Sequence, residues 1–80
     1  MKKIIVTGGS GFIGSNLVQF LLKKKYFVIN IDKSSYSANP YNVKKFKKNK
    51  NYLFFKLDIN EREKIFKIFK KYRPIGIFNL

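Results

Sequence analysis

The chain has 80 residues and a net charge of +14, and it contains neither cysteine nor histidine. This length allows one domain at most, with a small core. The missing residue types exclude disulfides, thiolate metal sites and histidine as a general base. No apolar run approaches the ~20 residues of a membrane span, and the apolar stretch after Met1 is too short for an export signal. We therefore expect a cytoplasmic protein that does not enter a membrane.

The positive charge comes almost entirely from lysine, because Arg62 and Arg73 are the only arginines. One interpretation is a nucleic-acid surface, for which the best candidate is the lysine-rich run 44–50 with Phe46 and Tyr52 as stacking aromatics. The other is codon bias in an A/T-rich genome. A nucleic-acid surface more often favours arginine, whose fork matches phosphate and guanine. The pattern therefore favours a solvated lysine surface, and we do not expect nucleic acid as a partner.

The first half of the chain predicts a strand, a helix and a second strand. Residues 2–7 form a short apolar run that is typical of a buried strand. Residues 12–25 have helical spacing and end in lysines, which suit a helix C-terminus. Residues 27–31 form a second apolar strand, which ends at Asp32. The expected buried stripe of the helix consists of Ile13, Leu17, Phe20 and Leu21.

The second half continues the alternation. Residues 33–50 predict a loop with a short helix at about 41–48, and residues 52–57 predict a third strand. Asn60 is expected to cap a second long helix and to form a capping box with Glu63. Arg73-Pro74 ends that helix, and residues 75–80 begin a fourth strand. The expected buried stripe of this helix consists of Ile65, Ile68, Phe69 and Tyr72.

Strands that alternate with helices predict an α/β fold with a parallel sheet. In the Rossmann-type doubly wound arrangement, the strands would lie in the order 3-2-1-4, with helices on both faces. The winding reverses between the first and fourth strands, and ligands bind at that point. Because the fourth strand is apolar and nothing in the sequence would cover it, we interpret residues 1–80 as the N-terminal part of a longer nucleotide-binding domain, truncated in the fourth strand.

The segment 7–14 reads Thr-Gly-Gly-Ser-Gly-Phe-Ile-Gly and lies between the first strand and the first helix. Gly8 allows a tight turn, Gly11 lets a phosphate approach the backbone, and Gly14 lets the helix pack close to the sheet. Ser10 adds a hydroxyl donor. This arrangement favours a dinucleotide pyrophosphate site over a glycine-rich turn without a ligand. Phe12 and Ile13 are expected to be packing residues within this loop.

Asp32 ends the second strand, 18 positions after Gly14 in the sequence. An acid at this place accepts hydrogen bonds from the adenosine ribose hydroxyls and repels a 2′-phosphate, which predicts NAD rather than NADP. Lys33 follows and would soften this preference. The alternative is an aspartate that only caps a turn.

Asp58-Ile59 follows the third strand, where it would lie beside the adenine; the alternative is a turn before a helix cap.

The spacing Tyr-x-x-x-Lys occurs at Tyr41/Lys45 and at Tyr52/Lys56. The second pair lies on a predicted strand, where it would span about 13 Å, and the first would lie at the adenosine end. We assign neither pair to catalysis and expect the catalytic residues beyond Leu80.

Residues 7–17 closely resemble the signature of the extended short-chain dehydrogenases/reductases that act on nucleotide sugars. Within that group, residues 30–39 resemble the corresponding stretch of the dTDP-glucose 4,6-dehydratase family, from which they depart at Ser34, Ser35 and Ser37. Residues 55–59 and 72–74 also fit. The resemblance spans essentially the whole chain, although the glycine signature is common to the superfamily.

The resemblance implies that bound NAD takes a hydride from C4 of dTDP-glucose, that water leaves across C5 and C6, and that the hydride returns to C6. It also implies a homodimer, with Leu80 as a cofactor-binding residue and a segment after Leu80 lining the nicotinamide side. The active-site Tyr-x-x-x-Lys, threonine and Asp-Glu pair of the family have no counterpart here, so we expect the 80 residues alone to be inactive. The alternatives are a nucleotide-sugar 4-epimerase and, from another class, a small basic nucleic-acid-binding module.

Overall fold

The structure is a computed structural model that describes residues 1–33, 46 and 48–80. Most of the expected loop and the short helix at about 41–48 lie outside the described residues. The described elements are, in chain order, β1 (Lys3–Thr7), α1 (Phe12–Lys23), β2 (Phe27–Asp32), β3 (Tyr52–Lys56), α3 (Arg62–Tyr72) and β4 (Gly76–Asn79).

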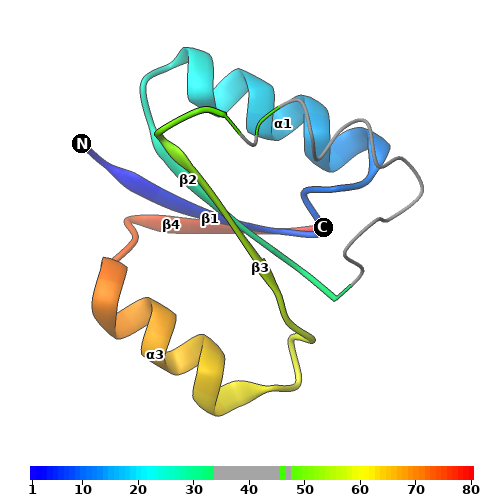
Figure 1. The fold of residues 1–80 in the computed structure, drawn as a ribbon, viewed down its shortest axis with the longest axis vertical. Helices are drawn as coiled ribbons and strands as arrows, with labels where there is room; N and C mark the ends of the chain where they lie inside the picture. Colours follow the sequence, from blue (N-terminus) through cyan, green and yellow to red (C-terminus); the bar gives the residue numbers. More distant parts are fainter. Residues whose placement is uncertain (34–45, 47) are drawn as a thin grey trace.

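The four strands form one sheet in the order β3-β2-β1-β4. All neighbouring pairs are parallel, and Ile5 of β1 lies between Ile29 of β2 and Ile77 of β4. The two described helices lie on opposite faces of this sheet (Figure 1). The expected doubly wound sheet and its strand order 3-2-1-4 are therefore confirmed.

The core has two layers because successive side chains of a strand point to opposite faces of the sheet. Ile4 and Val6 pack with Val18 and Leu21 of α1, whereas Ile5 belongs to the cluster on the α3 face. On that second face, Ile68 of α3 packs with the β2 residues Ile29 and Ile31. Both faces of the central strands are thus apolar, which is typical of a parallel sheet covered by helices.

The buried face of α1 differs from the expected stripe. Phe12 and Ile13 are 78% and 73% exposed, so the prediction that they are packing residues is wrong. Phe20 is also exposed, at 55%. The face of α1 that packs against the sheet carries Gly14, Ser15, Val18 and Leu21 instead. Because a helix turns about 100° per residue, an orientation with Gly14 toward the sheet directs Phe12 and Ile13 away from it.

Both helices end in a residue with left-handed backbone conformation that is not glycine. Lys25 follows α1 with φ of 69°, and the amide of Tyr26 donates to the carbonyl of Leu21. The pattern is that of a Schellman motif, which ends α1 two residues earlier than predicted. Arg73 ends α3 with φ of 48°, just before Pro74. The predicted stop of the second helix at Arg73-Pro74 is confirmed.

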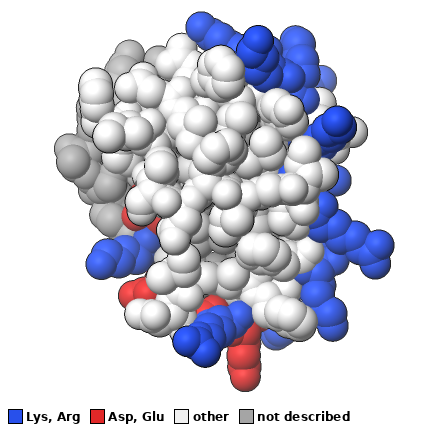
Figure 2. Space-filling view, turned by 180° about the vertical axis from the view of Figure 1, so that it is seen from behind, with Lys and Arg blue, Asp and Glu red and all other residues white. Residues whose placement is uncertain are grey.

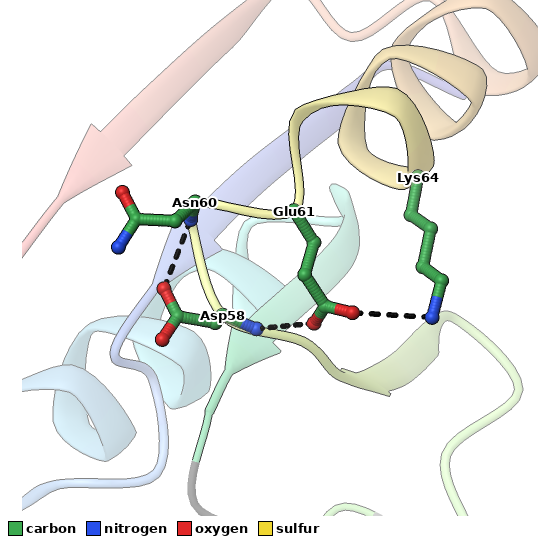
Figure 3. A network of polar contacts seen from close by, with 4 residues as sticks. All are labelled: Asp58, Asn60, Glu61 and Lys64. Carbon is green, nitrogen blue, oxygen red and sulfur yellow. Dashed lines mark hydrogen bonds and ion pairs between the residues drawn. The ribbon is translucent and has the colours of Figure 1, made fainter.

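The start of α3 does not form the predicted capping box of Asn60 and Glu63. The carboxylate of Asp58 accepts the amide of Asn60 at 2.9 Å, which makes Asn60 part of a turn (Figure 3). Glu61 occupies the cap position, and its Oε2 accepts the amide of Asp58 at 2.9 Å. Its Oε1 lies 3.1 Å from Nζ of Lys64. The acid that reaches back toward the preceding strand is therefore Glu61, two positions before the acid expected to do so.

Replacing Glu61 with glutamine is expected to lower the urea midpoint of unfolding at neutral pH. The hydrogen bond from the Asp58 amide, and next that from Lys64, lowers the pKa of Glu61 from its usual value. Because this pKa is lower in the folded state than in the unfolded state, the ionised carboxylate stabilises the protein at pH values above the unfolded-state pKa of about 4.3. This stabilisation disappears as the pH falls through the folded-state pKa. The difference between Glu61→Gln and the parent chain should therefore shrink in acid.

The matched control for this prediction is Glu63→Gln. Glu63 is an exposed acid in the first turn of the same helix, so its replacement removes the same charge. Equal urea midpoints for the two variants at neutral pH would show that the contacts of Glu61 add nothing beyond its charge.

Strand β4 pairs with β1 on one side, and its apolar side chains remain accessible. Ile77 and Phe78 are 47% and 43% exposed, and the flanking Ile75 is 62% exposed. Among the described residues, neither helix has the length and apolar character to cross a membrane. The cytoplasmic location stays a prediction.

Candidate functional site

A cavity of about 310 Å³ lies at the carboxyl ends of the strands. The ends of β1, β2 and β4 line it together with the segment that follows β3, because the carboxyl ends of parallel strands meet at one edge of the sheet. Its lining includes the carboxyl ends of the paired strands β1 and β4, between which the winding reverses. The residues that line it are Thr7, Gly8, Ile31, Asp32, Lys33, Leu57, Asp58, Ile59, Asn60, Asn79 and Leu80.

The glycine loop between β1 and α1 needs glycine for different reasons at different positions. Gly8 has φ of +76°, which disfavours any side chain. A Cβ on Gly14 would lie 2.2 Å from the carbonyl oxygen of Gly8, so the helix packs directly on the loop backbone. A Cβ on Gly11 would have only the Gly8 oxygen near it, at 3.8 Å. The protein itself leaves this space open, as an approaching ligand requires.

The N-terminus of α1 opens beside this loop. The amide of Ser15 donates to the carbonyl of Gly11 at 2.8 Å, whereas the first amides of a helix have no partner within the helix. Gly11 is the cap residue and supplies no side-chain hydrogen bond. The amides of Phe12, Ile13 and Gly14 therefore belong to a helix end whose dipole favours an anion.

The structure brings Asp32 to the glycine loop. Its Oδ2 lies 3.4 Å from the amide nitrogen of Ser10, and the residue also lines the cavity beside the exposed Lys33. The side chain of Ser10 is buried, and its Oγ accepts a hydrogen bond of 3.1 Å from Asn30. The hydroxyl of Ser10 thus contacts the core amide, and its expected role as a phosphate donor stays a prediction.

Three further expected site residues border the cavity. Ile59 is 51% exposed, and Asp58 precedes it with one carboxylate oxygen in the turn toward Asn60. Leu80 lies across the cavity, where its amide donates to the carbonyl of Thr7 at 3.2 Å. The Cβ of Leu80 would lie 3.6 Å from a Cβ on Gly8, so this residue contacts the start of the glycine loop.

The sequence analysis missed Asn30, Thr7 and Asn79. Asn30 is fully buried in β2, and its Oδ1 accepts the amide of Gly9 at 2.8 Å. The hydroxyl of Thr7 donates to Oδ1 of Asn79 at 2.6 Å, which joins the ends of β1 and β4. The sequence signal for Asn30 was a polar residue inside an apolar strand, because a buried side-chain amide needs hydrogen-bond partners nearby.

The charges of the described residues are separated along the strands. A cation stands at or just before the amino end of each strand, namely Lys3, Lys25, Lys50 and Arg73. The acids lie at the other end, where they end β2, follow β3 or stand at the start of α3: Asp32, Asp58, Glu61 and Glu63. In Figure 2 most blue side chains lie at the top and along the right border, and the red ones lie at the left and the bottom, where some blue side chains accompany them. In this part of the chain, the excess positive charge lies mainly away from the cavity.

The parallel sheet, the glycine loop at its first turn and the acid at the end of β2 together define a Rossmann-type fold. Within that class, residues 5–80 match the family model described as GDP-mannose 4,6 dehydratase. The chain belongs to this family.

The relatives are enzymes that act on nucleotide sugars. A dTDP-glucose 4,6-dehydratase from Haemophilus influenzae is 44% identical over 81 residues, which cover 100% of this chain and 24% of the relative. The crystal structure of dTDP-glucose 4,6-dehydratase from Bacillus anthracis in complex with NAD is 39% identical, with a TM-score of 0.90, and the match covers 100% of this chain and 26% of that one. The resemblance to the dTDP-glucose 4,6-dehydratases is thus confirmed.

An epimerase is similar as well. The structure of UDP-glucose 4-epimerase from Thermotoga maritima with UDP-glucose is 40% identical, with a TM-score of 0.81, and the match covers 98% of this chain and 23% of that one. The chain therefore spans about a quarter of the length of these relatives.

Proposed function

We propose that the chain is the NAD-binding part of a dTDP-glucose 4,6-dehydratase. The observation that carries this proposal is the cavity at the carboxyl ends of the strands, where the fold brings the glycine loop and Asp32 together. The loop provides helix amides for the pyrophosphate, and Asp32 provides a carboxylate for the adenosine ribose. The NAD in the related dehydratase structure supports this choice of cofactor.

The residues of the site fit the two ends of the dinucleotide. The backbone at Gly11 is open to an approaching phosphate, because a side chain there would have almost no protein neighbour within 4 Å. Asp58 and Ile59, in the segment after β3, border the cavity and would hold the adenine by a hydrogen bond and by apolar packing. Leu80, at the opposite side of the cavity, would face the nicotinamide half.

When bound, NAD would accept a hydride from the sugar and return it. The residues of this chain would bind and orient the cofactor, and catalytic side chains from a further segment would act on the sugar. We therefore propose that these 80 residues form the first half of the nucleotide-binding domain. The exposed apolar side chains of β4 support this proposal, because an uncovered strand edge of this kind favours aggregation. A homodimer of the longer protein is part of the same proposal.

A nucleotide-sugar 4-epimerase is the second candidate. The 40% identity to the Thermotoga maritima epimerase favours it specifically, and that similarity includes nearly the whole chain. Both candidates use the same cofactor-binding half, so the residues of the cavity do not separate them. Product analysis with the complete gene product separates them, because a dehydratase forms a 4-keto-6-deoxy sugar and an epimerase inverts C4.

Calorimetric titration of the 80-residue chain with NAD tests the proposal. We expect one saturable NAD site, and no 4-keto sugar when dTDP-glucose is added. A parallel titration with a DNA duplex tests the basic nucleic-acid-binding module, whose affinity would fall steeply with salt. Tight, salt-sensitive DNA binding without saturable NAD binding would contradict the proposal, and turnover of dTDP-glucose would contradict the absence of catalytic groups.

A further inference from the structure

Asn30 is a buried polar residue at the centre of the sheet. It lies in β2, one of the two inner strands, and its side chain is completely inaccessible. An amide buried without hydrogen-bond partners is strongly unfavourable. The structure supplies three partners: Oδ1 accepts the amide of Gly9 at 2.8 Å, and Nδ2 lies 3.1 Å from Ser10 Oγ and 3.0 Å from the Tyr52 hydroxyl.

The amide of Asn30 determines where the glycine loop lies. A Cβ on Gly9 would lie 2.5 Å from Oδ1 of Asn30, so the loop backbone rests on this side chain. The same side chain contacts the next residue, Ser10, whose backbone amide is directed to Asp32 two positions further along β2. Two side chains on one face of β2 thus fix two consecutive loop residues.

Tyr52 holds the amide of Asn30 from the other side. Its ring is buried and packs against Phe46, with the ring centroids 5.5 Å apart. Burial raises the pKa of the Tyr52 phenol from its usual value, so this hydroxyl is neutral at physiological pH. A neutral phenol can accept the Nδ2 hydrogen, which leaves Oδ1 directed at the loop.

We propose that Asn30, oriented by Tyr52, is a positioning residue that places the glycine loop for a dinucleotide pyrophosphate before the ligand binds. This inference rests on the proposed function. Ordering a backbone residue costs conformational entropy, and glycine loses more of this freedom than any other residue. A loop of several glycines therefore binds its ligand more tightly when contacts within the folded protein, and not the ligand, order its backbone.

The experiment compares Tyr52→Phe and Asn30→Leu with the parent chain, using NAD and adenosine as ligands. Tyr52→Phe removes one hydroxyl and keeps the ring, and Tyr26→Phe is the control, because Tyr26 packs against the same cluster away from the loop. A single net hydrogen bond is worth a factor of about 3–10 in binding. We expect this loss of NAD affinity in Tyr52→Phe, a larger loss in Asn30→Leu, and no change in Tyr26→Phe.

Adenosine separates positioning from general stability because it has no pyrophosphate. A variant that merely lowers the folded fraction would weaken NAD and adenosine by the same factor, and that result would overturn the inference. NAD affinities of both site variants equal to that of the parent chain would overturn it too. If Asn30→Leu does not fold, Tyr52→Phe alone decides between these results. Failure of the parent chain to bind NAD would overturn the proposed function, and this inference with it.

Discussion

Replacing Gly14 with alanine is expected to destabilise the chain by about 1–3 kcal/mol, the usual range for overpacking in a well-packed core. The added Cβ would lie 2.2 Å from the carbonyl oxygen of Gly8 and 2.7 Å from Cα of Gly9. Both neighbours are backbone atoms, so a change of rotamer cannot relieve the clash. Helix α1 must move away from the loop, and the fraction of this variant that stays folded should bind NAD at least about tenfold more weakly. Urea unfolding and calorimetry measure the two effects.

The sign of this effect depends on the clash, because alanine in a helix is otherwise favoured over glycine by about 1 kcal/mol. Gly76→Ala in β4 is the matched control, since a Cβ there has no neighbour within 4 Å. The control should be as stable as the parent chain or slightly more stable. A Gly14→Ala variant with unchanged stability and NAD affinity would contradict the close approach of helix and loop.

Replacing Asp32 with alanine is expected to weaken NAD binding about 10–100-fold, the value of hydrogen bonds to a charged group. Asp32 lies at the end of β2 beside the cavity, with Oδ2 3.4 Å from the amide of Ser10. Under the proposed function, the carboxylate accepts the ribose hydroxyls and repels a 2′-phosphate. NADP binding should therefore change little or become tighter. Calorimetric titration of the variant with each dinucleotide measures the ratio of the two affinities.

The control for Asp32→Ala is Glu63→Ala. Both substitutions raise the net charge of an already basic chain, which favours any anionic ligand and NADP most of all. Glu63 is exposed on α3 and does not line the cavity. An NAD/NADP ratio that changes equally in both variants would show that Asp32 acts only through its charge at a distance, and the assignment to the ribose would then be wrong.

The sheet was predictable because its signals are local and strong. The run Ile4-Ile5-Val6 is buried on both faces, and strict alternation with helices leaves few topologies once crossovers are right-handed. The place of the site followed from the same rule, because Asp32 and Asp58 both stand where a strand ends. The roles of the individual site residues stay predictions.

The rotation of α1 was not predictable from its apolar residues. Phe12, Ile13 and Phe20 are apolar but exposed, so the helix has no single apolar stripe that identifies its buried face. The close approach of Gly14 to the Gly8 carbonyl selects the face instead, and such a contact depends on the completed loop. Asn30 was missed for a related reason, since its partners come from the glycine loop and from β3.

The most direct measurement is a titration of the ¹⁵N-labelled chain with NAD, observed residue by residue in amide NMR spectra. The proposed function predicts saturable shifts at the helix end of the glycine loop, at Lys33 and at Ile59. It predicts no shifts at Lys3, Lys25 and Lys50, which lie at the amino ends of the strands. Shifts concentrated at those lysines, or none that saturate, would show that NAD meets a basic surface and not a cofactor site.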